Sequence, residues 1–470
     1  MIQTLNRQYL KDLLHQKNKH DTGDVIEVLP FLSKRTRAVR GQFNKILGEF
    51  VRNICCLQLN NSNLKNKDDL SYEGNELSEL IASTIEYENQ DDMYDFKRFL
   101  DAHLFNEDKI NPIHPYLYNY IELEKNLKNE FGKYAVFMNE TFVNDNEEIK
   151  TVFNNQESED ILTEVILTKL DALKPKKPLK EQQYEPLLPS LSKLFQEDLV
   201  YLSKHKDYFL TSFPLITHYY VFMYACQLIF KFEQFTSADF NEIQPLYFGL
   251  DGESLNKRRN AADGVENFKY IKEKSENLFP HIHTISQLNH NSIHQNNLKE
   301  EEQTLPFIPY GELYSLIKEQ GEEYEKNFLV ELKQWIKDYS TWAKVNVVDN
   351  STNIPEAFEV LHSCLTKGMS QGVIEKYGGN IEDLGANQFI KSRGSLGQVF
   401  NLKQDFLLIL TAVSVKDKRI PLNDLFIEFE KRGVALDMHS KKEVITLFNN
   451  LNIIDKKSDS GDAQYVKPIL

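Results

Sequence analysis

The sequence ends with NIIDKKSDSGDAQYVKPIL, residues 452–470, in which a polar turn containing glycine separates two short apolar segments. Ile453 and Ile454 precede this turn, and Tyr465 and Val466 follow it. Apolar segments on both sides of a glycine-containing turn are typical of a β-hairpin. Three amphipathic segments come before the hairpin, at residues 402–415, 421–433 and 440–452. Three helices followed by a hairpin wing predict a winged-helix-like module over residues 401–470.

The helices of this module carry recognisable end signals. Pro421 stands near the first turn of the second helix, and Gly433 stands at its end, in agreement with the preference for proline at helix starts and glycine just after helix ends. Ser440 is expected to cap the third helix, because Glu443 follows it three residues later as in a capping box.

The rest of the chain also has helical spacing. In residues 41–59, GQFNKILGEFVRNICCLQL, apolar residues recur three and four positions apart, which marks one face of a helix. The proline-rich stretch 173–191 favours an exposed connection. We therefore predict a mainly α, multi-domain protein, divided into an N-terminal helical domain (1–175), a Pro/Lys-rich linker (176–190), a central helical domain (191–346), a connecting segment with a glycine-rich loop (347–400) and the winged-helix-like module (401–470).

Composition limits the classes of function. The 470 residues are 41% hydrophobic and 27% charged, which predicts folded domains, and the net charge is -15. So acidic a chain is not expected to coat nucleic acid over its whole surface, because phosphate binding needs a positive face. The four cysteines have no metal-ligand spacing and predict free thiols and a cytoplasmic location. The start of the chain lacks the apolar core of a signal peptide.

Residues 208–230 contain no charged side chain and are long enough to cross a bilayer. Their four tyrosines and other polar residues are spread through the stretch, whereas membrane-spanning helices place tyrosine near the two ends. We expect a buried core helix here and no membrane partner.

Two groups of basic residues are candidate contacts for DNA or for a partner protein. From Lys403 to the end, eleven Lys and Arg against ten Asp and Glu give a net charge of +1, which leaves -16 for the rest of the chain. This module offers Lys441 and Lys442 at the start of its third helix and Lys456 and Lys457 on the wing. The second group, near the N-terminus, comprises Lys34, Arg35, Arg37 and Arg40. Surface cations also often pair with a protein's own carboxylates. A nearly neutral winged helix suits protein docking as well as DNA contact, so the residues leave both roles open.

The sequence contains no recognisable catalytic motif. The segment 281–294 holds four histidines, but its asparagine-rich surroundings favour a solvated loop over a zinc site. The glycines of SRGSLGQVF, residues 392–400, lack the lysine of a phosphate-binding loop, and we interpret them as a turn that allows close packing. We therefore predict no catalytic residue, no cofactor, no metal and no enzyme activity.

Both ends of the chain resemble one family. Residues 29–52, LPFLSKRTRAVRGQFNKILGEFVR, and the phrases at 393–413, 425–437 and 451–470 are similar to the DptG family of DNA phosphorothioation-dependent restriction systems. The resemblance implies a non-catalytic adaptor subunit of a bacterial defence complex. It further implies DptF-like and DptH-like partners that carry the nucleotide-dependent machinery, with double-stranded DNA as a further candidate ligand.

Two other functions remain as alternatives. The first is a DNA-binding transcriptional regulator whose helical body senses a ligand or dimerises. The second is a metal-dependent nuclease, for which the histidine segment is the one supporting feature.

Overall fold

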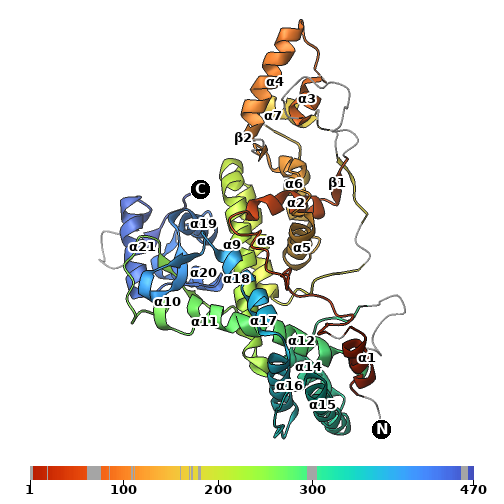
Figure 1. Cartoon of the computed structure of the whole chain (residues 1–470). Coiled ribbons are helices and arrows are strands. Elements are labelled where there is room, and N and C mark those ends of the chain that lie inside the picture. Colours follow the sequence, from red (N-terminus) through yellow and green to blue (C-terminus); the bar gives the residue numbers. More distant parts are fainter. Residues whose placement is uncertain are drawn as a thin grey trace. The chain divides into compact units, whose positions relative to one another are not determined.

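The computed structural model of the chain is mainly helical (Figure 1). It describes residues 4–17, 19–60, 76–83, 85–106, 109–110, 112–158, 160–168, 170, 173–177, 181–293, 304–456 and 464–470. These residues divide into two compact units. The first unit combines residues 1–41, 181–191 and 219–470, and the second combines residues 42–180 and 192–218. The prediction of a mainly α, multi-domain protein is thus confirmed.

The first unit contains a group of helices that pack around α12 (Figure 1). The indole Nε1 of Trp335 donates a hydrogen bond to Oε1 of Gln287 at 3.0 Å, and this joins two buried helix faces. The helices of the first unit that precede residue 401 include α1 (Arg7–Lys17), α10 (Asn260–Asp263), α11 (Phe268–Lys274), α12 (Leu278–Asn289), α14 (Tyr310–Glu319), α15 (Glu322–Ala343), α16 (Ile354–Gly368), α17 (Gln371–Gly378) and α18 (Asn380–Gly385).

The histidine segment is not a solvated loop, and that interpretation was wrong. His281, His283 and His290 are buried on or just after α12, while His294 lies outside the described residues. The ring of His281 stacks on that of His362 with centroids 3.9 Å apart. The asparagines that suggested solvent instead make internal hydrogen bonds, such as that from Nδ2 of Asn289 to the carbonyl of Ile285 at 2.8 Å.

The second unit has its core around α2. Arg52, on this helix, is buried, and its Nη1 donates to the carbonyl oxygens of Asn119 (3.0 Å) and Ile121 (2.7 Å). A separate apolar cluster joins α3, α4 and α7 (Figure 1). The elements of this unit are α2 (Leu47–Ile54), β1 (Leu57–Leu59), α3 (Glu76–Ser83), α4 (Gln90–Leu104), β2 (Phe105–Asn106), β3 (Lys109–Ile110), η2 (Pro115–Tyr120), α5 (Lys128–Met138), η3 (Asn139–Val143), α6 (Glu147–Asn154), α7 (Ile161–Thr168) and β4 (Leu173–Pro175).

The chain changes from one unit to the other inside two helices. In α8 (Pro189–Ser203) the change follows Leu191, and in α9 (Lys206–Phe232) it follows His218. The uncharged stretch 208–230 lies inside α9, and 83% of the most apolar window of this helix is buried. By length and composition alone α9 could cross a membrane, but its burial fits the expected core helix.

The chain also changes from the second unit to the first after Lys180, within the predicted linker 176–190. Residues 181–191 pack into the first unit, where Tyr184 is buried and forms a parallel β-bridge with Glu27. The backbone amide of Leu187 donates to the hydroxyl of Tyr224 at 2.8 Å. These contacts help to place the start of the chain in the same unit as its C-terminal half, an arrangement that the sequence pattern did not indicate.

Short strands connect the C-terminal part of the first unit to its middle. The strand β8 (Gln398–Leu402) pairs antiparallel with β7 (Ile390–Ser392) and parallel with β6 (Gly249–Leu250). The turn between β7 and β8 contains Gly394 and Gly397, which have φ angles of 55° and 76°. A Cβ atom at either glycine would meet nothing within 4 Å. Glycine is therefore suited to this turn because of its left-handed backbone and not, as we had expected, because of close packing.

Candidate interaction surface of the winged-helix module

The C-terminal residues form the predicted winged helix. Its elements are α19 (Gln404–Val415), β9 (Ile420–Pro421), α20 (Leu422–Lys431), β10 (Val434–Ala435), α21 (Met438–Asn450), β11 (Ile454–Lys456) and β12 (Gln464–Val466). The hairpin pairs β11 with β12 in the register Ile454↔Val466. The sequence pattern missed β9, which pairs antiparallel with β12 and completes a three-stranded sheet in the order β11-β12-β9. Three helices and this sheet give the module the topology of winged-helix domains.

The third helix, α21, begins earlier than the sequence predicted. Asp437 is its N-cap, and Oδ1 of this residue accepts hydrogen bonds from the backbone amides of His439 (3.0 Å) and Ser440 (2.9 Å). Ser440 was expected to cap the helix, and that prediction was wrong. Its side chain is buried and participates in a different set of contacts. Aspartate is as good an N-cap as serine, so this local sequence signal did not decide between them.

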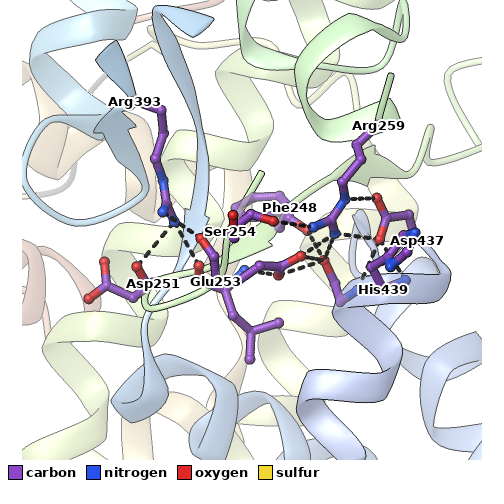
Figure 2. A network of polar contacts seen from close by, with 10 residues as sticks. Phe248, Asp251, Glu253, Ser254, Arg259, Arg393, Asp437 and His439 are labelled. Carbon is purple, nitrogen blue, oxygen red and sulfur yellow. Dashed lines mark hydrogen bonds and ion pairs between the residues drawn. The ribbon is translucent and has the colours of Figure 1, made fainter. Parts of the chain in front are cut away.

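A buried ionic network holds the start of α21 against the segment 248–259 (Figure 2). Nε and Nη2 of Arg259 donate to the two carboxylate oxygens of Asp437 at 2.7 and 2.6 Å. Arg259 also pairs with Glu253, whose carboxylate accepts a hydrogen bond from the hydroxyl of Ser440 at 2.8 Å. The network therefore fixes the position of α21 within the first unit.

The electrostatics of the network favour its charged form. Burial would raise the pKa of the Asp437 carboxyl, but the Arg259 guanidinium and the amide of Ser440 hold this pKa below its usual value. Burial likewise opposes the charge of Arg259, while Asp437 and Glu253 raise the pKa of its guanidinium. The Asp437 carboxylate is thus ionised at neutral pH and binds internal donors, so the N-terminal end of α21 already has its anionic ligand.

The opposite side of α21 faces solvent. Ser440, Val444 and Phe448 form its buried stripe, whereas Met438 is 65% exposed. The solvent-facing residues are Met438, His439, Lys442, Glu443, Thr446, Asn449 and Asn450; we call them the α21 face. This face carries one lysine and one glutamate, and its other members are uncharged polar residues, one methionine and one histidine.

The two lysines at the start of α21 have different surroundings. Nζ of Lys441 lies 5.0 Å from the ring centroid of Phe426 and 3.7 Å from Oε1 of Glu430, so this side chain packs on α20. Lys442 belongs to the exposed α21 face. Of this predicted pair, Lys442 is therefore the one that is directed toward solvent.

Arg419, which precedes β9 and contacts the wing, is a further cation that the sequence reasoning did not single out. Lys456 takes the last position of β11, opposite Gln464, and Lys457 lies outside the described residues. The guanidinium of Arg419, just before β9, lies 5.4 Å from the ring centroid of Tyr465 on β12. Only the pairing of β9 with β12 brings these two residues together, so no local pattern could have indicated the contact.

The N-terminal basic group divides into structural and exposed members. Nη2 of Arg35 donates to Oδ1 of Asp383 at 2.8 Å, and the Asp383 side chain has no exposed surface. Lys34, Arg37 and Arg40 are exposed. Arg35 is thus bound to the protein's own carboxylate, whereas the other three remain candidate contacts.

Within the part of the chain that the structure describes, no group of three or more His, Cys, Asp or Glu is placed to hold a metal ion. All four cysteines are free. No protein-family model and no curated protein matches this sequence.

Proposed function

We propose that the chain is a non-catalytic adaptor subunit of a bacterial DNA restriction complex of the phosphorothioation-dependent class, which bridges ATPase and helicase-like partners. The resemblance of both chain ends to the DptG family provides the link to restriction. The supporting structural observation is a winged helix that is anchored on one side by a buried ionic network and leaves the α21 face open to solvent.

Within this proposal, the α21 face docks a partner protein. Binding to DNA phosphates requires a surplus of positive charge, but Lys442 and Glu443 offset each other on this face. The exposed Met438 adds apolar surface of a kind that is enriched in protein interfaces. The Arg259 network also occupies the end of α21 that winged helices direct toward a DNA groove. These features favour a DptF-like or DptH-like protein over DNA as the direct ligand of the face.

Co-purification from cells that express the whole system tests this proposal. We would compare the double variant Met438→Asp/Lys442→Glu with Lys326→Glu, which changes a 79% exposed lysine on α15. The double variant should retain its fold and lose most of the DptF-like and DptH-like protein that co-purifies with it. The Lys326→Glu control should retain both partners.

Two results would contradict the proposal. One is partner retention by the double variant equal to that of the unaltered chain. The other is a chain that purifies alone and binds one short operator with nanomolar affinity, which would instead support a transcriptional regulator. If the double variant keeps its partners but loses DNA in a salt-dependent manner, the α21 face contacts DNA and not protein.

A further inference from the structure

A cavity of about 330 Å³ lies beside the hairpin formed by β7 and β8 in the first unit. Its volume is at the lower end of the ~300–1,000 Å³ typical of small-molecule pockets. The residues that line it are Arg40, Asp251, Ala386, Asn387, Ile390, Lys391, Ser392, Gln398, Asn401 and Lys403. They come from three distant parts of the sequence, so no single motif could have indicated the cavity.

The lining has the opposite charge to the protein as a whole. Arg40, Lys391 and Lys403 supply three positive charges against the one carboxylate of Asp251, in a chain with a net charge of -15. Nζ of Lys391 pairs with Oδ1 of Asp251 at 2.9 Å, which leaves Arg40 and Lys403 as the surplus cations. Lys403 is also the N-cap of α19. An anion is the ligand that these two cations suit.

Another part of the lining requires a hydrogen-bond donor. Asn401 is only 2% exposed, and its Nδ2 donates to Oδ1 of Asp251 at 3.0 Å. Oδ1 of the same amide is buried and has no hydrogen-bond partner. The reverse orientation of the amide would place two oxygens against each other, so the assignment of the unpaired oxygen is firm. A buried acceptor without a donor costs roughly 1–3 kcal/mol, and a donor that reaches this oxygen would recover that cost.

Asp251 supplies a second acceptor. Hydrogen bonding from Lys391 is the main reason that the pKa of the Asp251 carboxyl is below its usual value, so the group is ionised at neutral pH. Half of the side chain is exposed, which leaves it accessible to a donor. In dinucleotide-binding folds an Asp or Glu carboxylate accepts a hydrogen bond from a ribose hydroxyl, so the Asp251 carboxylate is suited to a sugar hydroxyl.

We propose that this cavity binds a phosphorylated sugar, with the phosphate at Arg40 and Lys403 and the hydroxyl groups at Asn401 and Asp251. None of the ten described residues that line it is aromatic, so a nucleobase has no stacking partner among them. The ligand is either a free sugar phosphate or the ribose phosphate part of a nucleotide. The proposal is independent of the docking role of the α21 face.

The wall of the cavity is already held in place. The Arg393 guanidinium, between the two strands, donates from Nη1 to the carbonyl of Glu253 (2.7 Å) and from Nη2 to that of Leu250 (2.7 Å). Figure 2 shows the Arg393 side chain pointing toward the segment that carries Asp251 and Glu253. A preformed wall reduces the ordering cost of binding.

Titration calorimetry on the full chain tests the proposal, with ribose 5-phosphate, AMP, inorganic phosphate and ribose as separate ligands. Ribose 5-phosphate should bind with one site per chain and at least about tenfold more tightly than either phosphate or ribose. If AMP binds as tightly as ribose 5-phosphate, the ligand is a nucleotide. If AMP binds less tightly, the ligand is a free sugar phosphate. Inorganic phosphate that binds as tightly as ribose 5-phosphate and AMP would overturn the proposed role of the hydroxyl groups. An absence of saturable binding for all four ligands would overturn the site.

Matched substitutions locate the binding. Arg40→Gln and Lys403→Gln should each weaken ribose 5-phosphate binding about tenfold, since each removes one charge-assisted contact. Arg37→Gln and Lys34→Gln remove exposed cations of the same basic group that do not line the cavity, and they should leave binding unchanged. If all four variants weaken binding equally, the ligand responds to general surface charge and the cavity is not its site.

Discussion

Arg259 and Asp437, which lie 178 positions apart in the sequence, form a bidentate ion pair with N–O distances of 2.7 and 2.6 Å. The same guanidinium pairs with Glu253, whose side chain is 2% exposed. One buried cation therefore balances two carboxylates and connects the start of α21 to the middle of the chain. Nearby, β10 pairs with β5 (Leu246–Tyr247) in the register Val434↔Leu246, so the winged helix is built into the first unit by backbone as well as by charge.

The Arg259→Ala variant should lose about 3–5 kcal/mol of unfolding free energy, because it leaves the buried Glu253 carboxylate and the partly buried Asp437 carboxylate without their cation. Chemical denaturation followed by circular dichroism measures this loss. The neighbouring Arg258→Ala is the control, since that side chain is exposed and its removal should change stability by less than about 0.5 kcal/mol. Neutralising both acids in the Arg259→Ala background, with Glu253→Gln and Asp437→Asn, should recover part of the loss. No recovery would contradict charge imbalance as the cause.

Arg35→Ala should also destabilise the protein, by roughly 3 kcal/mol, because the Asp383 side chain is fully buried beside it. Arg37→Ala, in the same basic group, changes an exposed residue and should have an effect near zero. Thermal unfolding of the two variants provides the comparison. Equal midpoints would show that Arg35 is not a structural residue and would return it to the candidate contacts.

The module at 401–470 could be predicted because its signals are local. Apolar spacing defined its three helices, and a glycine-containing turn between Ile454 and Tyr465 defined its hairpin. The features that local spacing does not encode were missed. These are the third strand β9, the cap at Asp437 and the pairing of Arg259 with Asp437, each of which depends on residues brought together by the tertiary fold.

The histidine segment was misjudged for a related reason. Asparagine beside histidine is common in solvated loops, but in α12 the side chain of Asn289 bonds to carbonyl oxygens at 2.8 and 3.0 Å and so can be buried. Whether a polar residue finds such partners is decided by packing and not by its neighbours in sequence. The cavity was missed in the same way, since Arg40, which was predicted as a candidate contact, and Asn401 lie far apart in the chain.

His283 should make stability depend on pH. Burial, together with the nearby His20, lowers its pKa to about 3, although Asp21 acts in the opposite direction. In the unfolded chain the pKa is about 6.5, so the unfolded state binds more protons between these values and stability falls as the pH decreases through this window. The contribution lost between pH 7 and pH 5 is about 2 kcal/mol. In His283→Gln, the unfolding free energy should fall less steeply with decreasing pH. An unchanged slope would contradict the assignment.

Gly433, which follows α20, tests how tightly the winged-helix module packs against the rest of the first unit. Its φ angle is 88°, and a Cβ atom there would lie 2.7 Å from Sδ of Met223. Gly394 also has a positive φ, of 55°, but has open space around it. Gly394→Ala should therefore cost only the backbone strain of about 1–2 kcal/mol, whereas Gly433→Ala adds an overpacking cost of about 1–3 kcal/mol. Denaturation midpoints measure both variants. Met223→Ala in the Gly433→Ala background should remove the overpacking cost, because it removes the side-chain atoms that the new Cβ would meet. Equal stability losses in Gly433→Ala and Gly394→Ala would show that there is no overpacking cost.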